Sequence, residues 1–221
     1  MDDPGYWIEE RVFSTQECTD LIRLLETAEI GRSRAGARHL MSHPVITSLA
    51  NDERMRIIAR RAIGGNATPF RATLFEKSAR SNWLVIWHQD TTLPLQSRVD
   101  SPEWGPWSTK AGVLYAHAPA WALERVVALR LHLDTCGAEN GPLRVIPHSH
   151  RHGVLTDEQV FQLAHRQPAD ECLVGRGGVL MMRPLVVHAS SKSVSHEPRR
   201  VLHLEYANSL ELLGLIQLAI A

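Results

Sequence analysis

Hydrophobic residues recur at helical spacing in the first part of the chain. Ser14 and Glu17 form a capping box, and apolar residues follow every three or four positions, which predicts a helix over 15–27. Asn51 is predicted to cap a second helix, whose apolar stripe ends before Gly64. We expect both helices to be structural.

From about Phe70 onward, the pattern changes to short β-rich runs separated by Gly, Pro and Asn. A third helix interrupts them, because Thr156 and Gln159 form another capping box. Such runs are typical of a jelly roll or a barrel, so we expect a mainly β fold with flanking α-helices. The predicted strands are 70–76, 82–90, 125–134, 143–147, 171–174, 179–182, 185–189 and 200–207.

Length and composition set further limits. A chain of 221 residues can bury one full core, so a single domain over 1–221 is expected. The 24 basic and 24 acidic side chains cancel, so we expect no nucleic-acid or membrane partner; the oligomeric state stays open. Three widely spaced cysteines, no secretory signal and a tail too short to span a bilayer favour a cytoplasmic location.

The segment 87–90 carries the clearest chemistry. On a β-strand, residues two apart point to the same side, so His88 and Asp90 can hold one metal ion. His188, on a distant predicted strand, can supply a second imidazole. Two histidines and one carboxylate on one face of an ion are typical of non-haem Fe(II) oxygenases.

Strand alternation also predicts what surrounds these ligands. If His88 and Asp90 face a cavity, then Asn82, Leu84 and Ile86 share that face. Trp83, Val85 and Trp87 would then cover the opposite face. Both faces would then be buried, so we expect a sandwiched sheet with a cavity inside and helices outside.

Several blocks, taken together, resemble one family in content and order. They are GYWIEE at 5–10, WHQD at 87–90, NGPLRVIPHSH at 140–150, LVVHASS at 185–191 and the pair Arg199-Arg200. In this order the sequence resembles the phytanoyl-CoA dioxygenase family over nearly its whole length.

The resemblance implies a double-stranded β-helix, with a jelly-roll, cupin-like core. It also implies an enzyme that uses Fe(II), 2-oxoglutarate and O2 to hydroxylate a small organic metabolite, with 2-oxoglutarate converted to succinate and CO2. By position, His88, Asp90 and His188 match the family's metal ligands and catalytic centre.

The cosubstrate residues are assigned in the same way. Arg199, eleven residues after His188, matches the arginine that pairs with the distal carboxylate of 2-oxoglutarate, and Ser190 matches a hydroxyl residue beside it. A guanidinium suits this role because it presents a planar fork and stays charged when buried. Arg200 would point to the opposite strand face. Asn82 and Gln89 are further cosubstrate candidates.

Asp90 narrows the reaction. Halogenating relatives replace this carboxylate by a small residue, so that chloride can take the vacated position. Its presence favours hydroxylation, or another oxidation such as desaturation or ring formation. No basic patch for a coenzyme A thioester stands out, and the sequence does not identify the substrate.

Other polar and aromatic clusters are candidates too. Arg130 and His132 share one strand face and line either a polar cavity or an exposed surface. Trp104 and Trp107, with Lys110, lie in the long segment 97–122 and form either a substrate lid or a loop anchored by buried indoles.

The alternating histidines His148, His150 and His152 offer a rival metal site, although no carboxylate accompanies them. Two other functions fit the same fold: a cupin-like isomerase or hydrolase that needs no 2-oxoglutarate, and a noncatalytic barrel that binds a small molecule. Arg199 and Ser190 favour the oxygenase, and the complete ligand set disfavours the noncatalytic protein.

Overall fold

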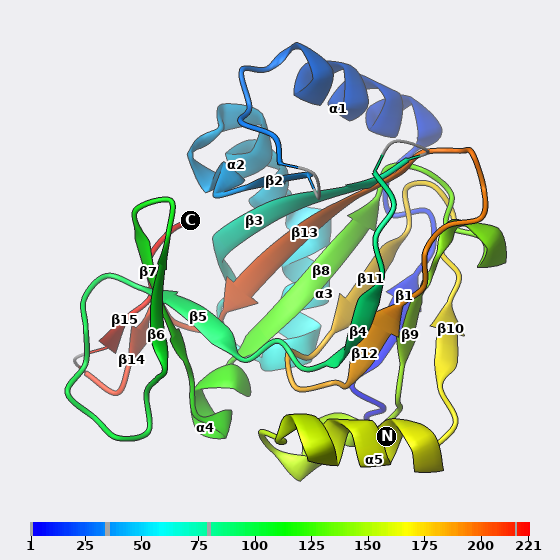
Figure 1. Ribbon diagram of the computed structural model, residues 1–221. Helices are drawn as coiled ribbons and strands as arrows, with labels where there is room; N and C mark the ends of the chain where they lie inside the picture. Colours follow the sequence, from blue (N-terminus) through cyan, green and yellow to red (C-terminus); the bar gives the residue numbers. More distant parts are fainter. Residues whose placement is uncertain (1, 34–35, 79–80, 215) are drawn as a thin grey trace.

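The protein consists mainly of antiparallel sheets with a few helices around them (Figure 1); the computed structural model describes residues 2–33, 36–78, 81–214 and 216–221. The larger sheet has the strand order β1 (Tyr6–Glu9), β11 (Val179–Met182), β8 (Val126–His132), β13 (Arg199–Ala207), β3 (Thr68–Lys77) and β2 (Gly36–Arg38). A four-stranded sheet has the order β10 (Asp170–Cys172), β9 (Leu143–Val145), β12 (His188–Ser190) and β4 (Val85–His88).

The two sheets pack face to face through an apolar cluster to which both contribute. Ala128, Leu180 and Met182 of the larger sheet are buried against Leu143 and Val145 of the smaller one. This arrangement is the two-layer jelly-roll core expected of a cupin-like protein.

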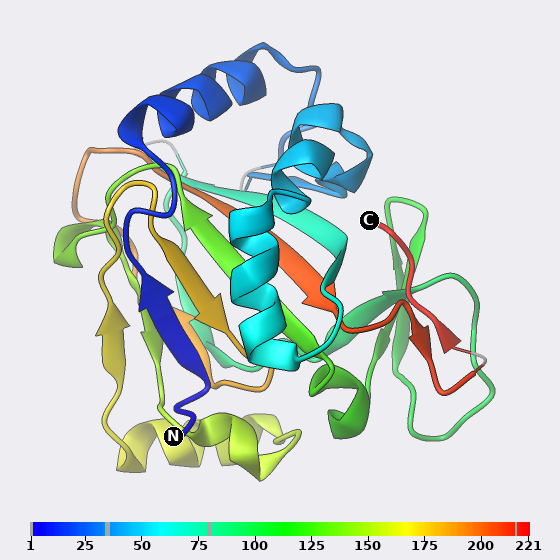
Figure 2. The same cartoon turned by 180° about the vertical axis from the view of Figure 1, so that it is seen from behind.

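Helices cover the outer face of the larger sheet. The helices α1 (Thr15–Thr27), α2 (Pro44–Ala50) and α3 (Glu53–Ile63) lie on that side, and α3 crosses the sheet in Figure 2. In β8, Leu129 and Leu131 enter the core below these helices, whereas Arg130 points to the interior between the sheets. The whole strand is buried, so neither of its faces is exposed.

The remaining elements are short. The helix α5 (Asp157–Arg166) lies below the four-stranded sheet in Figure 1. Beside the main sheets lie two small ones, β5 (Thr92–Leu95), β7 (Val113–His117) and β6 (Trp107–Lys110), and β14 (Glu211–Leu212) with β15 (Ile216–Gln217). The other helical turns are α4 (Ala120–Leu123), η1 (Leu40–Ser42), η2 (Ala138–Asn140) and η3 (Ser149–His152).

The predicted fold class is confirmed, with local corrections. The helix over 15–27 has the predicted bounds, and both capping boxes are formed. Asn51, however, ends α2, and the side chain of Asp52 caps α3 by accepting a hydrogen bond from Arg54 N–H. The seven-residue α2 was not predicted, because so short a helix offers hardly two turns of periodicity.

The segment 97–122 is not a plain loop. It holds the β6–β7 hairpin, whose turn places Ala111 and Gly112 at positive φ, and the helix α4. An Ala-Gly turn lacks the Asn-Gly or Asp-Gly signal of a hairpin, so sequence reasoning did not detect it. None of the described helices is long and apolar enough to cross a membrane.

Candidate metal centre

Two histidines and an aspartate meet between the facing sheets. His88 ends β4 and is the cross-strand partner of His188, which begins β12. The Asp90 carboxylate lies 3.7 Å from His88 Nε2 and 3.6 Å from His188 Nε2, and the three ligand atoms are all within 4.8 Å of one another. No other group of this kind occurs in the described part of the chain. One metal ion can therefore be held by all three.

Hydrogen bonds orient both imidazoles for coordination. Nδ1 of His88 lies 2.8 Å from the carbonyl oxygen of Ile86, and Nδ1 of His188 lies 2.8 Å from that of Val186. Because a carbonyl only accepts, each Nδ1 carries the proton and each Nε2 keeps a free lone pair. Burial lowers the pKa of His188 to about 4, so this imidazole is neutral near pH 7.

Asp90 is held as a carboxylate. Its burial opposes ionisation, but attraction to the protonated forms of His188, His203 and His88 outweighs this effect and brings the pKa of Asp90 to about 2. Its backbone N–H donates to Pro184 O at 2.9 Å, which fixes the chain just beyond β4. The centre thus offers one carboxylate and two imidazoles, the set typical of non-haem Fe(II) oxygenases.

A bulge in β4 changes the alternation beside the ligands. Across β4 and β12, His88 pairs with His188 and Val85 pairs with Ser190. Three steps along β4 therefore match two steps along β12, so β4 contains one extra residue, the mark of a β-bulge.

The predicted cavity face of β4 is wrong for this reason. Trp83 and Val85 line the cavity together with His88, whereas Leu84 and Ile86 are 56% and 73% exposed. One inserted residue moves every residue before it to the other face of the strand.

The cavity at the ligands measures about 280 Å³. Pockets for small ligands commonly span roughly 300–1,000 Å³, so this one suits a small molecule beside a cosubstrate. Apart from the three ligands, its lining residues are Arg38, Arg71, Thr73, Phe75, Trp83, Val85, Thr92, Lys110, Arg130, Leu143, Ser190, Arg199, His203 and Glu205.

Buried cations gather at one end of this cavity. Arg199 is 4% exposed, and its guanidinium donates to Gly141 O; its Nε has no hydrogen-bond partner among the described residues. Lys77, 1% exposed, lies behind Ser190 and donates from Nζ to Ser190 Oγ at 2.8 Å and to Ser191 O at 2.6 Å. Burial, followed by the charge of Arg199, lowers the pKa of Lys77 to about 8.

Arg130 adds a third cation to this end. Its Nη1 lies 3.0 Å from His203 Nδ1, and burial together with the charge of Arg199 lowers the pKa of Arg130 to about 10. Within the described residues, Lys77, Arg130 and Arg199 make no ion pair with a carboxylate. Buried cations without a counter-ion are costly, and an anionic ligand relieves that cost. Lys77 was missed in the sequence, where it is one lysine at the end of a strand.

The arginine pair is divided between two faces of β13. Arg199 lies in the cavity, as expected from the strand alternation. Arg200 points away from it, where its guanidinium donates to the Asp134 carboxylate at 2.8 and 2.9 Å and to Glu26 at 3.0 Å.

Asn82 and Gln89 lie outside the cavity. The Asn82 amide donates to Ser193 O and accepts from Ser193 N–H, at 2.7 and 2.8 Å. Gln89 donates to two backbone carbonyls and accepts from Leu155 N–H. Their amide groups hold loops in place, so neither is available to a cosubstrate.

The remaining candidates are placed as follows. Trp104 is buried and packs edge-on against Trp121, and Trp107 lies below the Arg98 guanidinium; neither lines the cavity. The interpretation as indoles that anchor a loop therefore fits them. His132 is buried next to the cation cluster, outside the cavity lining, with no hydrogen-bond partner for either nitrogen among the described residues.

The rival histidine cluster does not come together as a metal site. His148 Nδ1 lies 3.1 Å from Asp3 O, and His148 Nε2 lies 3.7 Å from the exposed carboxylate of Asp2. The ring of His150 packs against Gly5 instead. Among the described residues, no three ligand groups converge here.

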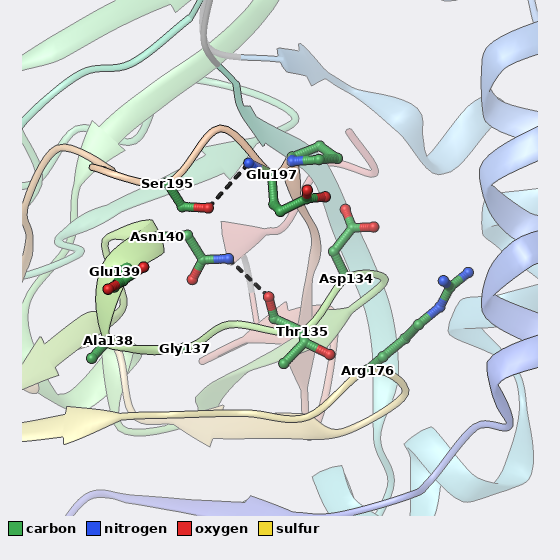
Figure 3. A pocket seen from close by; sticks show the side chains of 10 residues that line it. Asp134, Thr135, Gly137, Ala138, Glu139, Asn140, Arg176, Ser195 and Glu197 are labelled. Atoms are coloured by element: carbon green, nitrogen blue, oxygen red, sulfur yellow. Dashed lines mark hydrogen bonds between the residues drawn. The ribbon is translucent and has the colours of Figure 1, made fainter.

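A second hollow, of about 440 Å³, lies in the loops beyond β8 (Figure 3). Asp134, one of its acidic residues, is paired with Arg200. The other contacts inside it are local, from Asn140 to Thr135 O and from Glu197 N–H to the Ser195 hydroxyl. It contains none of the three metal-ligand residues, so the cavity between the sheets is the better candidate.

Comparisons with known proteins agree with a ligand set of the non-haem Fe(II) oxygenase type. The family model of phytanoyl-CoA dioxygenase matches residues 1–201. The chain belongs to the phytanoyl-CoA dioxygenase family. A search of curated proteins found no match.

Solved structures share the fold. A crystal structure of EctD from S. alaskensis with bound Fe has a TM-score of 0.68 and 23% identity over 92% of this chain and 73% of that one. The structure of HygX from Streptomyces hygroscopicus, with nickel and 2-oxoglutarate bound, has a TM-score of 0.66 and 16% identity, over 92% of this chain and 83% of that one. The structure of AviO1 from Streptomyces viridochromogenes Tue57 has a TM-score of 0.64 and 20% identity, over 93% of this chain and 90% of that one.

Proposed function

We propose that this protein is an Fe(II)- and 2-oxoglutarate-dependent oxygenase that hydroxylates a small organic metabolite. The observation that carries the proposal is the combination, in one cavity, of the three ligands and a buried cluster of unpaired cations. A cupin-like isomerase or hydrolase needs the ligands but does not need 2-oxoglutarate, the anion that we assign to these cations.

The ligand set fits the metal. His88, Asp90 and His188 would hold iron from one side, and the hydrogen bonds at the two Nδ1 atoms keep both Nε2 lone pairs directed at it. Bound there with 2-oxoglutarate, iron would supply the activation of O2 that converts the cosubstrate to succinate and CO2. The residues contribute a fixed ligand geometry and a site enclosed between two sheets.

The cation cluster fits the cosubstrate. We propose that Arg199 and Ser190 bind the distal carboxylate of 2-oxoglutarate, with Lys77 positioning the Ser190 hydroxyl. The free Nε of Arg199 and the charge of Arg130 remain to stabilise the anion. HygX was crystallised with 2-oxoglutarate, and so was EctD, together with 5-hydroxyectoine, which supports this use of the fold.

Asp90 favours hydroxylation, or another oxidation such as desaturation or ring formation, over halogenation. With the carboxylate present, no ligand position on the protein side is left for a halide. The cavity of about 280 Å³ limits the substrate to a small molecule.

The cellular setting is part of the same proposal. Cys18, Cys136 and Cys172 are all buried and unpaired, which supports a reducing compartment, and we propose a cytoplasmic location. We also propose that residues 1–221 act as one domain.

Anaerobic titration with Fe(II) and 2-oxoglutarate tests the function. We expect a weak visible charge-transfer band from the chelate, followed by succinate formation when O2 and substrate are admitted. Iron binding without that band would reject the proposal in favour of the isomerase or hydrolase.

A further inference from the structure

A second group of cations lies at the opposite end of the cavity. On β3, Arg71 is six residues before Lys77, and the register pairs Lys77 with Arg199 but Arg71 with Glu205. Six residues of strand span roughly 20 Å, so the two ends are well separated. A 2-oxoglutarate that binds Arg199 and chelates the metal already has both of its carboxylates engaged, so it does not occupy this second group.

Arg71, Arg38 and Lys110 reach this end from three different strands. On β2, Arg38 is the register partner of Thr73, which also lines the cavity. Lys110 ends β6, and its Nζ lies 5.0 Å from the centre of the Tyr115 ring. The Arg71 guanidinium lies 5.3 Å from the centre of the same ring.

The charges at this end are not balanced. Arg71 makes an ion pair with Glu205 at 3.2 Å, and its Nη1 also donates to Thr92 O, just beyond Asp90. Neither Arg38 nor Lys110 has a carboxylate partner within the described ranges. Two cations therefore stay uncompensated at the mouth of the cavity.

The three cations are close enough to repel one another. Burial, followed by the charges of Arg38 and Arg71, lowers the pKa of Lys110. Burial and the charges of Arg71, Arg38 and Lys110 likewise lower the pKa of His39. Like charges held together in the absence of a ligand are typical of an anion site, because the anion removes the repulsion.

We propose that the substrate carries an anionic oxygen group, a carboxylate or a phosphate, which Arg38 and Lys110 bind at this end of the cavity. Arg71 completes the site and connects it to the metal centre through Thr92. The rest of the substrate then extends from these cations toward the metal ligands, which line the same cavity. This inference rests on the proposed function, since it concerns the substrate of that oxygenase.

Calorimetric titration of the protein loaded anaerobically with Fe(II) and saturating 2-oxoglutarate tests the site. Under these conditions the Arg199 end is filled, and the probes are benzoate, phenyl phosphate and the neutral analogue benzamide. We expect one of the two anions to bind roughly tenfold more tightly than benzamide, the size of a charged hydrogen bond. The stronger anion distinguishes a carboxylate substrate from a phosphate ester.

The variant Arg38→Gln/Lys110→Met should lose this preference, whereas Arg166→Ala, which removes an exposed arginine on α5, should keep it. Arg71 is left unchanged, because its removal would deprive the buried carboxylate of Glu205 of its ion-pair partner. An unchanged thermal unfolding temperature shows that the double variant folds. An equal affinity for all three probes, or a preference that survives in the double variant, would overturn the proposal.

The charge-transfer band separates this result from the function itself. If an anion weakens the band by displacing 2-oxoglutarate, it binds at the Arg199 end, and the proposed second site is refuted. If the wild type never forms the band, the oxygenase proposal fails; the same titration without iron then shows whether the anion preference exists by itself.

Discussion

Replacing Lys77 by methionine should change how the stability of the protein depends on pH. Lys77 is 1% exposed, and burial with the charge of Arg199 lowers its pKa from 10.5 to about 8. That difference corresponds to about 3 kcal/mol of unfavourable interaction for the charged form in the folded protein. Methionine keeps the length of the side chain without the charge.

The sign follows from proton binding. Below pH 8 the lysine is protonated in both the folded and the unfolded wild type, so its contribution to the free energy of unfolding is constant. Between pH 8 and 10.5 the folded protein has lost this proton and the unfolded chain still carries it, so the wild type gains stability as pH rises. Lys77→Met lacks this gain.

Urea unfolding without metal or 2-oxoglutarate, at pH values from 7 to 10, measures the effect. The free energy of unfolding of the wild type minus that of Lys77→Met should be flat below pH 7.5 and rise by about 2–3 kcal/mol toward pH 10. Lys192→Met, at an exposed lysine, is the matched control. A difference that does not change with pH would show that Lys77 is not held among unpaired cations.

Three further predictions follow from the site and the fold. Asp90→Ala should abolish succinate formation during hydroxylation, whereas His148→Ala should leave iron binding intact; loss of iron in the latter would move the centre to the other cluster. Arg199→Gln should raise the KM for 2-oxoglutarate at least tenfold with a smaller change in kcat, in steady-state succinate assays. Gly177→Ala should lower the free energy of unfolding, measured in urea, much more than Gly64→Ala, for which we expect a loss of about 1 kcal/mol. The reason is that a Cβ at Gly177 would lie 1.9 Å from Phe13 O, whereas a Cβ at Gly64 meets no other atom within 4 Å. Equal losses in the two variants would contradict this packing.

The placement of the candidate ligands could be predicted because it depends on residue types at fixed places. His88, Asp90 and His188 come together as expected, and the alternation along β13 correctly separated Arg199 from Arg200. Periodicity likewise located α1, because a capping box and an apolar stripe both marked it.

The features that could not be predicted depend on how strands pair and where their alternation is interrupted. The pairing of β3 with β13 brings Arg71 to the cavity wall and Lys77 behind Ser190, and it joins residues more than 120 positions apart. Arg38 comes from a three-residue strand that carries too little pattern to be detected. Asn82 was misplaced because strand alternation was assumed to continue unbroken.

The bulge in β4 has a consequence for anyone who transplants this motif. Grafting only His88 and Asp90 onto a regular strand would reproduce the ligands but turn Trp83 and Val85 out of the cavity. The unit to move is therefore the segment 83–90 together with its partner strand β12. In a designed protein, deleting one residue of that bulge would turn Trp83 and Val85 away from the cavity, while His88 and Asp90 would keep their positions.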